Sequence, residues 1–373
     1  MKRARPAMVL SGIAAVAVVG AAAWAVGPLH SGSSASPVPS TYTSPIPAST
    51  PLPTARPLAL RDLNVGLLVP ETEPGWRAAN TSSFTETATA DGIDLQVRNA
   101  NGSPATQLTQ FQTLISDPGV NVIVLAPFAG TTYDEALKAA QAAHKLVVVE
   151  GGYIASDPSL YLTRVASDYT AEGKMAGDAM CALLDPTSGD SATAIPSGGA
   201  SAAAGGTHRN VVEISSGADL NADGQRTQGF LTGMQVCGAT MAQGPISATD
   251  AASAETAMTT FLAGSRDVRG VFAHSDAQAI GAIVAIGKGG LKAGKDVQVV
   301  DIGGTTDGFK ALIAGDLGAM IDANPLLAPQ VYQAALDALN GVAVPVWIQA
   351  QDSKFLASQG ADSLPIWCAC HKY

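Results

Sequence analysis

The sequence has few charged residues and few aromatic rings. Charged residues make up 14% of the 373 residues and aromatic residues 5%, against roughly 25% charged residues in an ordinary soluble domain. Basic residues are the scarcer sign, because 21 Lys and Arg stand against 31 Asp and Glu, a formal net charge of −10. Binding to nucleic acid needs clustered Lys and Arg, so this composition excludes that class. The length allows a large core and, at about 150 residues per domain, two domains.

The signatures of several enzyme classes are also missing. The sequence contains no P-loop, no zinc-binding helix motif and no G-x-S-x-G elbow. The glycine-rich segment at 303–308 lacks the spacing of a dinucleotide site, and the five histidines lie far apart. We therefore expect no cofactor, no metal and no catalytic group. A C-x-C-H tail at Cys368, Cys370 and His371 is more typical of a disulfide or a plain tail than of a metal site.

The first thirty residues have the pattern of a targeting segment. Lys2, Arg3 and Arg5 precede an uncharged run, rich in Ala and Val, from residue 6 to residue 29. A cleaved export signal would use the small residues at 23 and 25 as its cleavage site. An uncleaved membrane anchor needs about 20 apolar residues, and the run is just long enough. Both alternatives place the rest of the chain outside the cytoplasm.

Two further segments are low in complexity. Residues 31–61 are mostly Ser, Thr, Pro and Ala, and residues 186–207 carry almost no charge. Neither composition can bury enough apolar area to fold. We expect the first to be a linker, either a tether from a membrane or wall or a tail without a role, and the second to be a disordered surface insert.

From residue 64 onward, apolar runs alternate with helical stretches. The predicted strands are Asn64–Pro70, Asp94–Arg98, Val120–Leu125, Leu146–Glu150, Asn210–Ile214, Gly270–Ala273 and Val297–Ile302. The predicted helices are Trp76–Ala90, Pro104–Ile115, Tyr133–His144, Ala171–Leu184, Gly224–Val236, Ala277–Lys288 and Gly308–Ala314. This alternation indicates βαβ units and parallel sheets. The series is too long for one open sheet of usual width, so we expect an α/β fold with two doubly wound lobes, whose ligand lies outside the carboxyl ends of the strands.

The strand ends resemble those of one known family, the periplasmic-type sugar-binding proteins of ABC importers. The segments that carry the resemblance are NVGLLVPETEPGWRAAN (64–80), SLYLTRVASDYTAEGKMAGD (159–178), NVVEISSGADLNADGQRTQGF (210–230) and VFAHSDAQAIGAIVAIGKGGLKAGKDVQVVDIGG (271–304). The sequence is most similar to members that bind galactofuranose and ribose. The family implies the periplasmic binding protein type I fold, in which two lobes joined by crossing strands at a hinge close over one sugar without catalysis.

The resemblance also implies a division of the chain and a partner. We assign residues 62–167 with 324–349 to an N-terminal lobe and residues 168–323 with 350–373 to a C-terminal lobe. We expect a monomer that delivers its ligand to an ABC permease in the membrane. Two alternatives use the same lobes, a ligand-sensing module for a membrane receptor and a binding protein reshaped for a non-sugar ligand. An exported hydrolase of sugar derivatives is a weaker alternative.

A sugar site needs groups that donate and accept hydrogen bonds in fixed directions, together with one aromatic plane. After the first strand, Trp76 would supply the plane, Arg77 a planar fork for adjacent hydroxyls and Glu73 an acceptor. Glu150 supplies a carboxylate after the fourth strand. The alternatives are a core tryptophan, a solvated arginine and a glutamate that only favours the helix N-terminus.

The remaining candidates belong to the second half of the chain. Asp168 resembles the family's aspartate at the lobe crossover and Arg226 its ligand arginine, while His274 and Asp276 follow a strand in AHSD. Asp168 and Asp276 are also good helix N-caps, and a histidine at a strand end is more often structural than a ligand. Asp301 lies two residues before position 303, on the same side of the strand but deeper in the sheet.

Four positions depart from the family pattern. Gly151 replaces an arginine, Tyr169 and Ser275 replace asparagines, and Gly303 replaces an aspartate. Lost charged contacts would leave buried partners unsatisfied, so we expect a pocket reshaped for its own ligand.

Four cysteines in an exported chain suggest disulfides, with three possible connectivities. Cys181 and Cys237 each end a predicted helix of the same lobe, and we prefer them as one bridge. Cys368 and Cys370 would close a strained short ring, so their state stays open.

Overall fold

The structure is a computed structural model and describes residues 56–71, 75–185, 209–217 and 220–363. All of these residues belong to a single compact unit. The expectations for residues 1–30, for the insert at 186–207 and for Cys368 and Cys370 concern residues outside this part, as do those for most of the linker. None of the helices in the described ranges has the length and apolar character to span a membrane.

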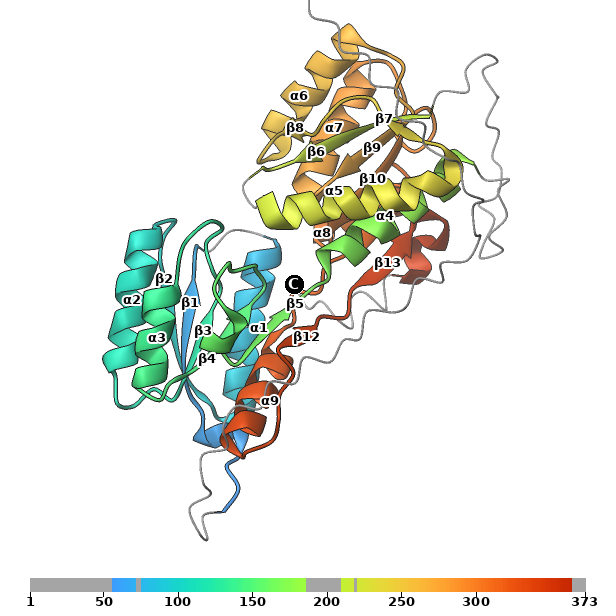
Figure 1. Cartoon of the computed structure of the whole chain (residues 1–373). Coiled ribbons are helices and arrows are strands. Elements are labelled where there is room, and N and C mark those ends of the chain that lie inside the picture. Colours follow the sequence, from blue (N-terminus) through green and yellow to red (C-terminus); the bar gives the residue numbers. More distant parts are fainter. Residues whose placement is uncertain (1–55, 72–74, 186–208, 218–219, 364–373) are drawn as a thin grey trace, which may run out of the picture. The chain divides into compact units, whose positions relative to one another are not determined.

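One six-stranded parallel sheet has the strand order β12-β5-β4-β3-β1-β2 (Figure 1). Its strands are β1 (Asn64–Val69), β2 (Asp94–Asn99), β3 (Val122–Leu125), β4 (Leu146–Glu150), β5 (Thr163–Ala166) and β12 (Trp347–Gln349). We call the part built on this sheet the N-terminal lobe. The central strands are apolar and buried along most of their length, as expected for a parallel sheet covered on both faces.

Helices cover both faces of this sheet (Figure 1). On one face, α1 (Trp76–Asp91) and α9 (Ala328–Leu339) bring Phe84 and Tyr332 together edge to face, with ring centroids 5.6 Å apart. On the other face, α2 (Pro104–Ser116) and α3 (Asp134–Ala142) bury Phe111 and Leu137. Short 3₁₀ turns precede β1 and β5, at Leu60–Asp62 and Pro158–Leu160.

A seven-stranded sheet forms the other part, which we call the C-terminal lobe. Its order is β13-β11-β10-β9-β6-β7, with β8 beside β6, and only β13 is antiparallel to its neighbour. Its strands are β6 (Asn210–Ser215), β7 (Thr240–Met241), β8 (Ile246–Ser247), β9 (Gly270–Ala273), β10 (Gln298–Gly303), β11 (Ala319–Asp322) and β13 (Ser353–Leu356). The helices α6 (Ala251–Gly264), α7 (Asp276–Lys288) and α8 (Thr306–Ala314) pack on one face, and α4 (Tyr169–Leu184) and α5 (Leu220–Met234) on the other. Two 3₁₀ segments, Gln235–Cys237 and Ala357–Ser363, follow α5 and β13.

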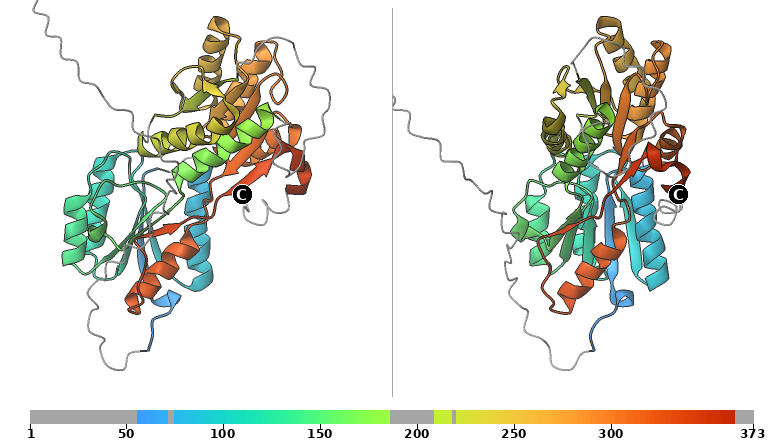
Figure 2. Two further views of the ribbon diagram at one scale, coloured as in Figure 1. Left: turned by 45° about the vertical axis from the view of Figure 1, so that its right-hand side comes forward. Right: turned by 90° about the vertical axis from the view of Figure 1, so that its right-hand side faces the viewer.

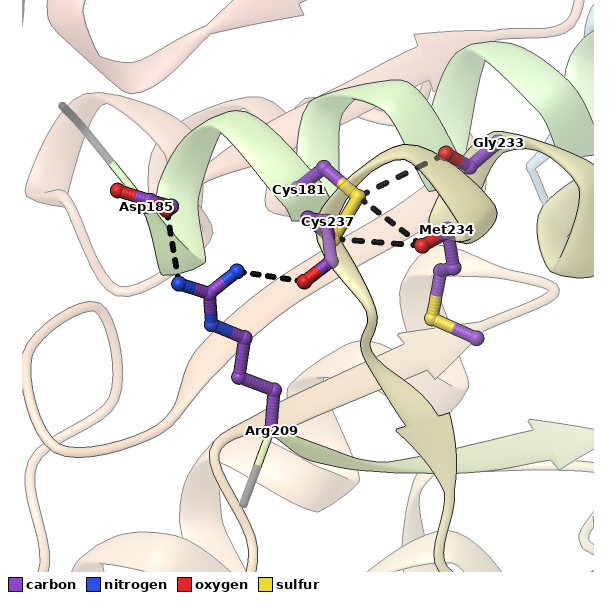
Figure 3. Close-up of a disulfide and its surroundings, with 6 residues drawn as sticks. All are labelled: Cys181, Asp185, Arg209, Gly233, Met234 and Cys237. Atoms are coloured by element: carbon purple, nitrogen blue, oxygen red, sulfur yellow. Dashed lines mark hydrogen bonds and ion pairs between the residues drawn. A yellow bond between two sulfur atoms is a disulfide. The ribbon is translucent and has the colours of Figure 1, made fainter. Parts of the chain in front are cut away.

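Helices α4 and α5 lie side by side in unusually close contact (Figure 2). Glycines at the crossing permit this approach, because a Cβ atom on Gly173 would lie 2.0 Å from the carbonyl oxygen of Arg226, and one on Gly229 equally close to that of Thr170. At the far end of the pair, the sulfurs of Cys181 and Cys237 are bonded, with their Cα atoms 5.5 Å apart (Figure 3). Arg209 pairs with Asp185 beside this bond, so the ends of α4 and α5 are tied together.

Three segments carry the chain between the two sheets. They run from β5 to α4, from β11 to α9 and from β12 to β13. The prediction of an α/β fold with two doubly wound, parallel-dominated sheets is therefore confirmed. The sequence analysis did not find α6, α9 or the strands β5, β7, β8, β11, β12 and β13. These strands are two to four residues long, and β7, β8, β12 and β13 are partly exposed.

Candidate functional site

A cleft of about 1170 Å³ lies at the carboxyl ends of the strands and is lined by residues of both lobes. This is where doubly wound sheets bind ligands. The N-terminal lobe contributes the segments after β1, β3 and β4, and the C-terminal lobe contributes those after β6, β9 and β10 together with the first turns of α4 and α5.

In the N-terminal lobe, Trp76 and Arg77 line the cleft from the first turn of α1. The guanidinium of Arg77 stacks on the Trp76 ring at 4.9 Å from its centroid. Arg77 Nη1 donates to Glu150 Oε1 at 2.8 Å and to Asn80 Oδ1 at 3.0 Å, and the Glu150 side chain is fully buried. Asn80 Nδ2 donates to the second oxygen of Glu150 and to the carbonyl of Pro325. Glu150 therefore orients and neutralises Arg77 from behind.

Trp76 also reaches a segment that connects the lobes. Its indole Nε1 donates to the carbonyl of Ala323 at 2.8 Å, and its ring packs against apolar clusters of both lobes. A Cβ atom on Gly151 would lie 2.8 Å from the ring edge, and the φ of Gly151 is +60°. The tryptophan thus fills the space next to Gly151, one of the positions that we expected to depart from the family pattern.

The C-terminal lobe contains a second arginine of the same kind. Arg226 Nε donates to Glu172 Oε2 at 2.8 Å, and the Glu172 side chain is fully buried. The guanidinium lies over the Tyr169 ring at 5.1 Å from its centroid. Tyr169, Glu172 and Arg226 all line the cleft, so each lobe presents one arginine that is backed by a buried glutamate and stacked on an aromatic ring.

His274 is held between two carboxylates at the end of β9. Its Nε2 lies 2.7 Å from Glu213 Oε1 and its Nδ1 lies 3.0 Å from Asp223 Oδ1. Burial alone would raise the pKa of Asp223, but its contacts with His274 and the N–H of Gly217 hold that pKa below its ordinary value. Both ring nitrogens are therefore engaged by carboxylates, and the side chain is 2% exposed.

Asp276 directs its carboxylate toward the segment between β10 and α8. Its Oδ2 accepts from the N–H groups of Gly304 and Thr305 at 3.0 and 3.1 Å. A Cβ atom on Gly303 would lie 2.2 Å from this oxygen, and one on Gly308 would lie 1.6 Å from Oδ1. The carboxylate of Asp276 therefore occupies the space that a side chain at position 303 would need.

Asp301 lies beneath Asp276 and is fully buried. Burial, reinforced by the neighbouring charge of Asp276, raises the pKa of Asp301 well above its ordinary value. Burial also raises the pKa of Asp276, although the N–H groups of Thr305 and Gly304 oppose it. The pair therefore holds one proton to higher pH than two exposed aspartates would.

The residues predicted from the sequence to bind the ligand lie in three kinds of position. Trp76, Arg77, Arg226, His274 and Asp276 line the cleft. Glu150 and Asp301 lie fully buried behind it, and the side chain of Asp168 caps α4 by accepting from the N–H of Ala171. Glu73 lies outside the described residues. Their roles in ligand binding stay predictions.

Sequence reasoning missed three polar residues of this site, Asn80, Glu172 and Asp223. All three lie on helices, one turn from a residue that lines the cleft. Each lies three residues from its partner on the same helix, and this spacing places the two on one helix face. The pairs are Arg77 with Asn80, Tyr169 with Glu172, and Asp223 with Arg226. This spacing could have indicated all three residues from the sequence. Across the described ranges of the chain, His, Cys, Asp and Glu form no group that would hold a metal ion.

The chain belongs to a family of ligand-binding proteins. The model of the periplasmic binding protein domain family matches residues 65–342, which include both sheets except β12, β13 and the start of β1. The predicted resemblance to this family is confirmed.

Two curated relatives illustrate the similarity. The galactofuranose-binding protein YtfQ of Escherichia coli is 26% identical over 277 residues, which cover 73% of this chain and 80% of the relative. The ribose import binding protein RbsB of Haemophilus influenzae is 26% identical over 237 residues, which cover 63% of this chain and 71% of the relative.

Solved structures show the same fold. A Mycobacterium smegmatis protein in complex with β-D-fucofuranose is 26% identical, with a TM-score of 0.70 over 83% of this chain and 98% of that one. The binding protein of the arabinose ABC transporter from Shewanella sp. ANA-3, bound to α- and β-L-arabinofuranose, is 27% identical, with a TM-score of 0.70 over 82% and 95% of the two chains.

Proposed function

We propose that this chain is an extracytoplasmic solute-binding protein that captures a small, neutral sugar or sugar-like compound and hands it unchanged to an ABC permease. One observation carries the proposal. Two arginines from different lobes, Arg77 and Arg226, line the same cleft, and each is backed by a fully buried glutamate. A cleft lined from two lobes suits a ligand that is enclosed on all sides.

The paired charges favour a neutral ligand. Glu150 and Glu172 neutralise the two arginines, so neither guanidinium carries an uncompensated charge for an anion. Among the described residues, Arg77 uses Nη1 and Arg226 uses Nε in these pairs. Their remaining N–H groups offer the planar fork that adjacent hydroxyls accept from.

An apolar face is supplied by Trp76. The ring stands beside Gly151, where the family's arginine is absent, and a C–H face of a sugar ring would pack on it. We therefore assign direct contacts to Trp76, Arg77 and Arg226, and supporting roles to Glu150 and Asp301. Contacts from Glu73, Asp168, His274 and Asp276 belong to the same proposal.

The relatives support the ligand class and the partner. The named relatives bind galactofuranose or ribose, and the matched structures hold fucofuranose and arabinofuranose. A pentose or hexose, in the furanose form for several of these proteins, is the ligand class that this chain shares with them. Export follows from the targeting pattern of residues 1–30, and we propose a monomer that does not catalyse a reaction.

A thermal-shift screen of the full chain against pentoses, hexoses and polyols tests the proposal. A neutral monosaccharide at a hundredfold excess over its Kd is expected to stabilise the fold by about 2.7 kcal/mol. The shift should vanish in Arg77→Ala and Arg226→Ala. It should persist in the matched controls Arg98→Ala and Arg266→Ala, since both of these arginines are exposed and lie outside the cleft.

The screen also includes a uronate and a sugar phosphate. Stabilisation by these anions, or equal stabilisation of the cleft variants and the wild type, would overturn the proposal for a neutral sugar in this cleft. Isothermal calorimetry on the best compound then gives the stoichiometry, which is expected to be one per chain.

A further inference from the structure

One carboxylate joins all three segments that run between the sheets. Asp352, between β12 and β13, accepts at Oδ1 from Ser167 Oγ at 2.9 Å and from the N–H of Asn324 at 3.0 Å. Ser167 lies between β5 and α4, and Asn324 lies between β11 and α9. A single side chain therefore links the three segments, which we call the crossing segments.

The charged groups that act on Asp352 are both acidic. Glu172 comes from α4 and is fully buried, and Asp322 ends β11 and is 4% exposed. Burial, together with the charges of Glu172 and Asp322, raises the pKa of Asp352 to about 7, although the hydrogen bonds from Asn324 and Ser167 oppose the shift. The group therefore changes its charge in a range that an exported protein meets.

The same cluster reaches the cleft. Glu172 holds Arg226 through Oε2, while its Oε1 is buried and accepts no hydrogen bond from the described residues. Ser167 itself lines the cleft. The indole of Trp347 donates to the carbonyl of Ala166, next to Ser167, and the indole of Trp76 donates to that of Ala323, next to Asn324.

We propose that Asp352 is a link between the three crossing segments whose strength depends on its protonation. When it is neutral, its oxygen still accepts from Ser167 and Asn324, and no repulsion arises with Glu172 and Asp322. When it is ionised, it is repelled by Asp322 and by Glu172, whose charge Arg226 compensates in part. Raising the pH therefore loosens the crossing segments, and a lower pH holds them together. This inference goes beyond the proposed function and does not depend on which ligand binds.

Tryptophan fluorescence of the full chain between pH 5 and 9, without ligand, tests whether the link made by Asp352 depends on pH. Two of the four tryptophans, Trp76 and Trp347, contact the crossing segments. The wild type is expected to show a transition with a midpoint near the pKa of Asp352, about 7. The transition should disappear in Asp352→Asn and should be unchanged in the control Asp94→Asn, because Asp94 is exposed at the start of β2.

Two further variants are expected to shift the midpoint of the fluorescence transition in opposite directions. Ser167→Ala removes a donor that stabilises the ionised form, so the midpoint should rise by roughly one pH unit, the effect of one hydrogen bond to a charged group. Asp322→Asn removes a repelling charge, so the midpoint should fall. A wild type without a transition, a transition that survives in Asp352→Asn, or midpoints that fail to move in these directions would each overturn the proposal. A failed sugar screen would leave it intact, since no ligand is used.

Discussion

In the N-terminal lobe, the cleft arginine is the sequence neighbour of the aromatic ring it stacks on, whereas in the C-terminal lobe the two come from different helices. Arg77 follows Trp76 on α1 and takes its glutamate from the end of β4. Arg226 on α5 stacks on Tyr169 of α4 and pairs with Glu172 of that helix. The two lobes thus reach the same arrangement of arginine, glutamate and ring through different connections.

The supporting contacts differ as well. Glu150 accepts from Asn80 as well as from Arg77, but the second oxygen of Glu172 accepts nothing from the described residues. The C-terminal arginine is therefore the more sensitive of the two, because its loss leaves a buried charge with less compensation.

The largest expected effect tests this asymmetry. Arg226→Ala is expected to cost about 3 to 5 kcal/mol of unfolding free energy, because it leaves Glu172 buried and unpaired. Arg77→Ala should cost less by about 1 kcal/mol, since Glu150 keeps one hydrogen bond. Urea denaturation measures both. In the double variant Arg226→Ala with Glu172→Ala, much of the loss should return. Equal costs for the two arginines would contradict the asymmetry.

A second test concerns the bond between α4 and α5. Cys181 and Cys237 are 56 residues apart, and breaking a bridge of this kind typically costs about 2 to 4 kcal/mol. Cys181→Ser with Cys237→Ser should therefore lower the stability of the C-terminal lobe, and hydrogen exchange should rise there while it stays unchanged in the N-terminal lobe. Wild type under a reducing agent is the matched comparison. Faster exchange spread evenly over both lobes would argue against a local constraint.

A third test compares Gly151 and Gly303, two of the positions that we expected to depart from the family pattern. Gly303→Ala is expected to destabilise by about 1 to 3 kcal/mol, because its Cβ would displace the carboxylate of Asp276. Gly151→Ala should cost about 1 to 2 kcal/mol, through its positive φ and its contact with Trp76. Thermal unfolding measures both. Adding Asp276→Ala should rescue Gly303→Ala and leave Gly151→Ala unimproved. Rescue of neither glycine variant would show that Asp276 is not what opposes the added methyl group.

The smallest effect concerns Asp301 and depends on pH. Its pKa is raised in the folded chain, so the folded state keeps a proton that the unfolded state loses. The unfolding free energy should then fall as pH rises from about 4. Asp301→Asn should change stability at pH 4 by less than about 1 kcal/mol and should make the decline toward pH 8 shallower. Urea denaturation at pH 4, 6 and 8 checks this, with Asp94→Asn as control. A decline as steep as in the wild type would exclude Asp301 as its source.

The sequence alone determined the fold class and the edge of the sheets where the cleft lies. Buried parallel strands appear in the sequence as short apolar runs, and for this reason β4 and β9 have the predicted bounds. Trp76 and Arg77 were predictable because they directly follow a strand. The short strands β12 and β13 were not, since they are partly exposed and lack that pattern.

Only the tertiary structure decided which polar groups meet. The pairing of Arg226 with Glu172 depends on how closely α4 and α5 approach, which the glycines at their crossing permit. The turn of Asp276 toward Gly304 and Thr305 depends on the space left at Gly303. The joining of Ser167, Asn324 and Asp352 depends on three distant segments passing side by side. Local sequence determines where helices and strands form. Hydrogen bonds and ion pairs need their two atoms to lie about 3 Å apart, so which residues pair is decided only when the helices and sheets have packed.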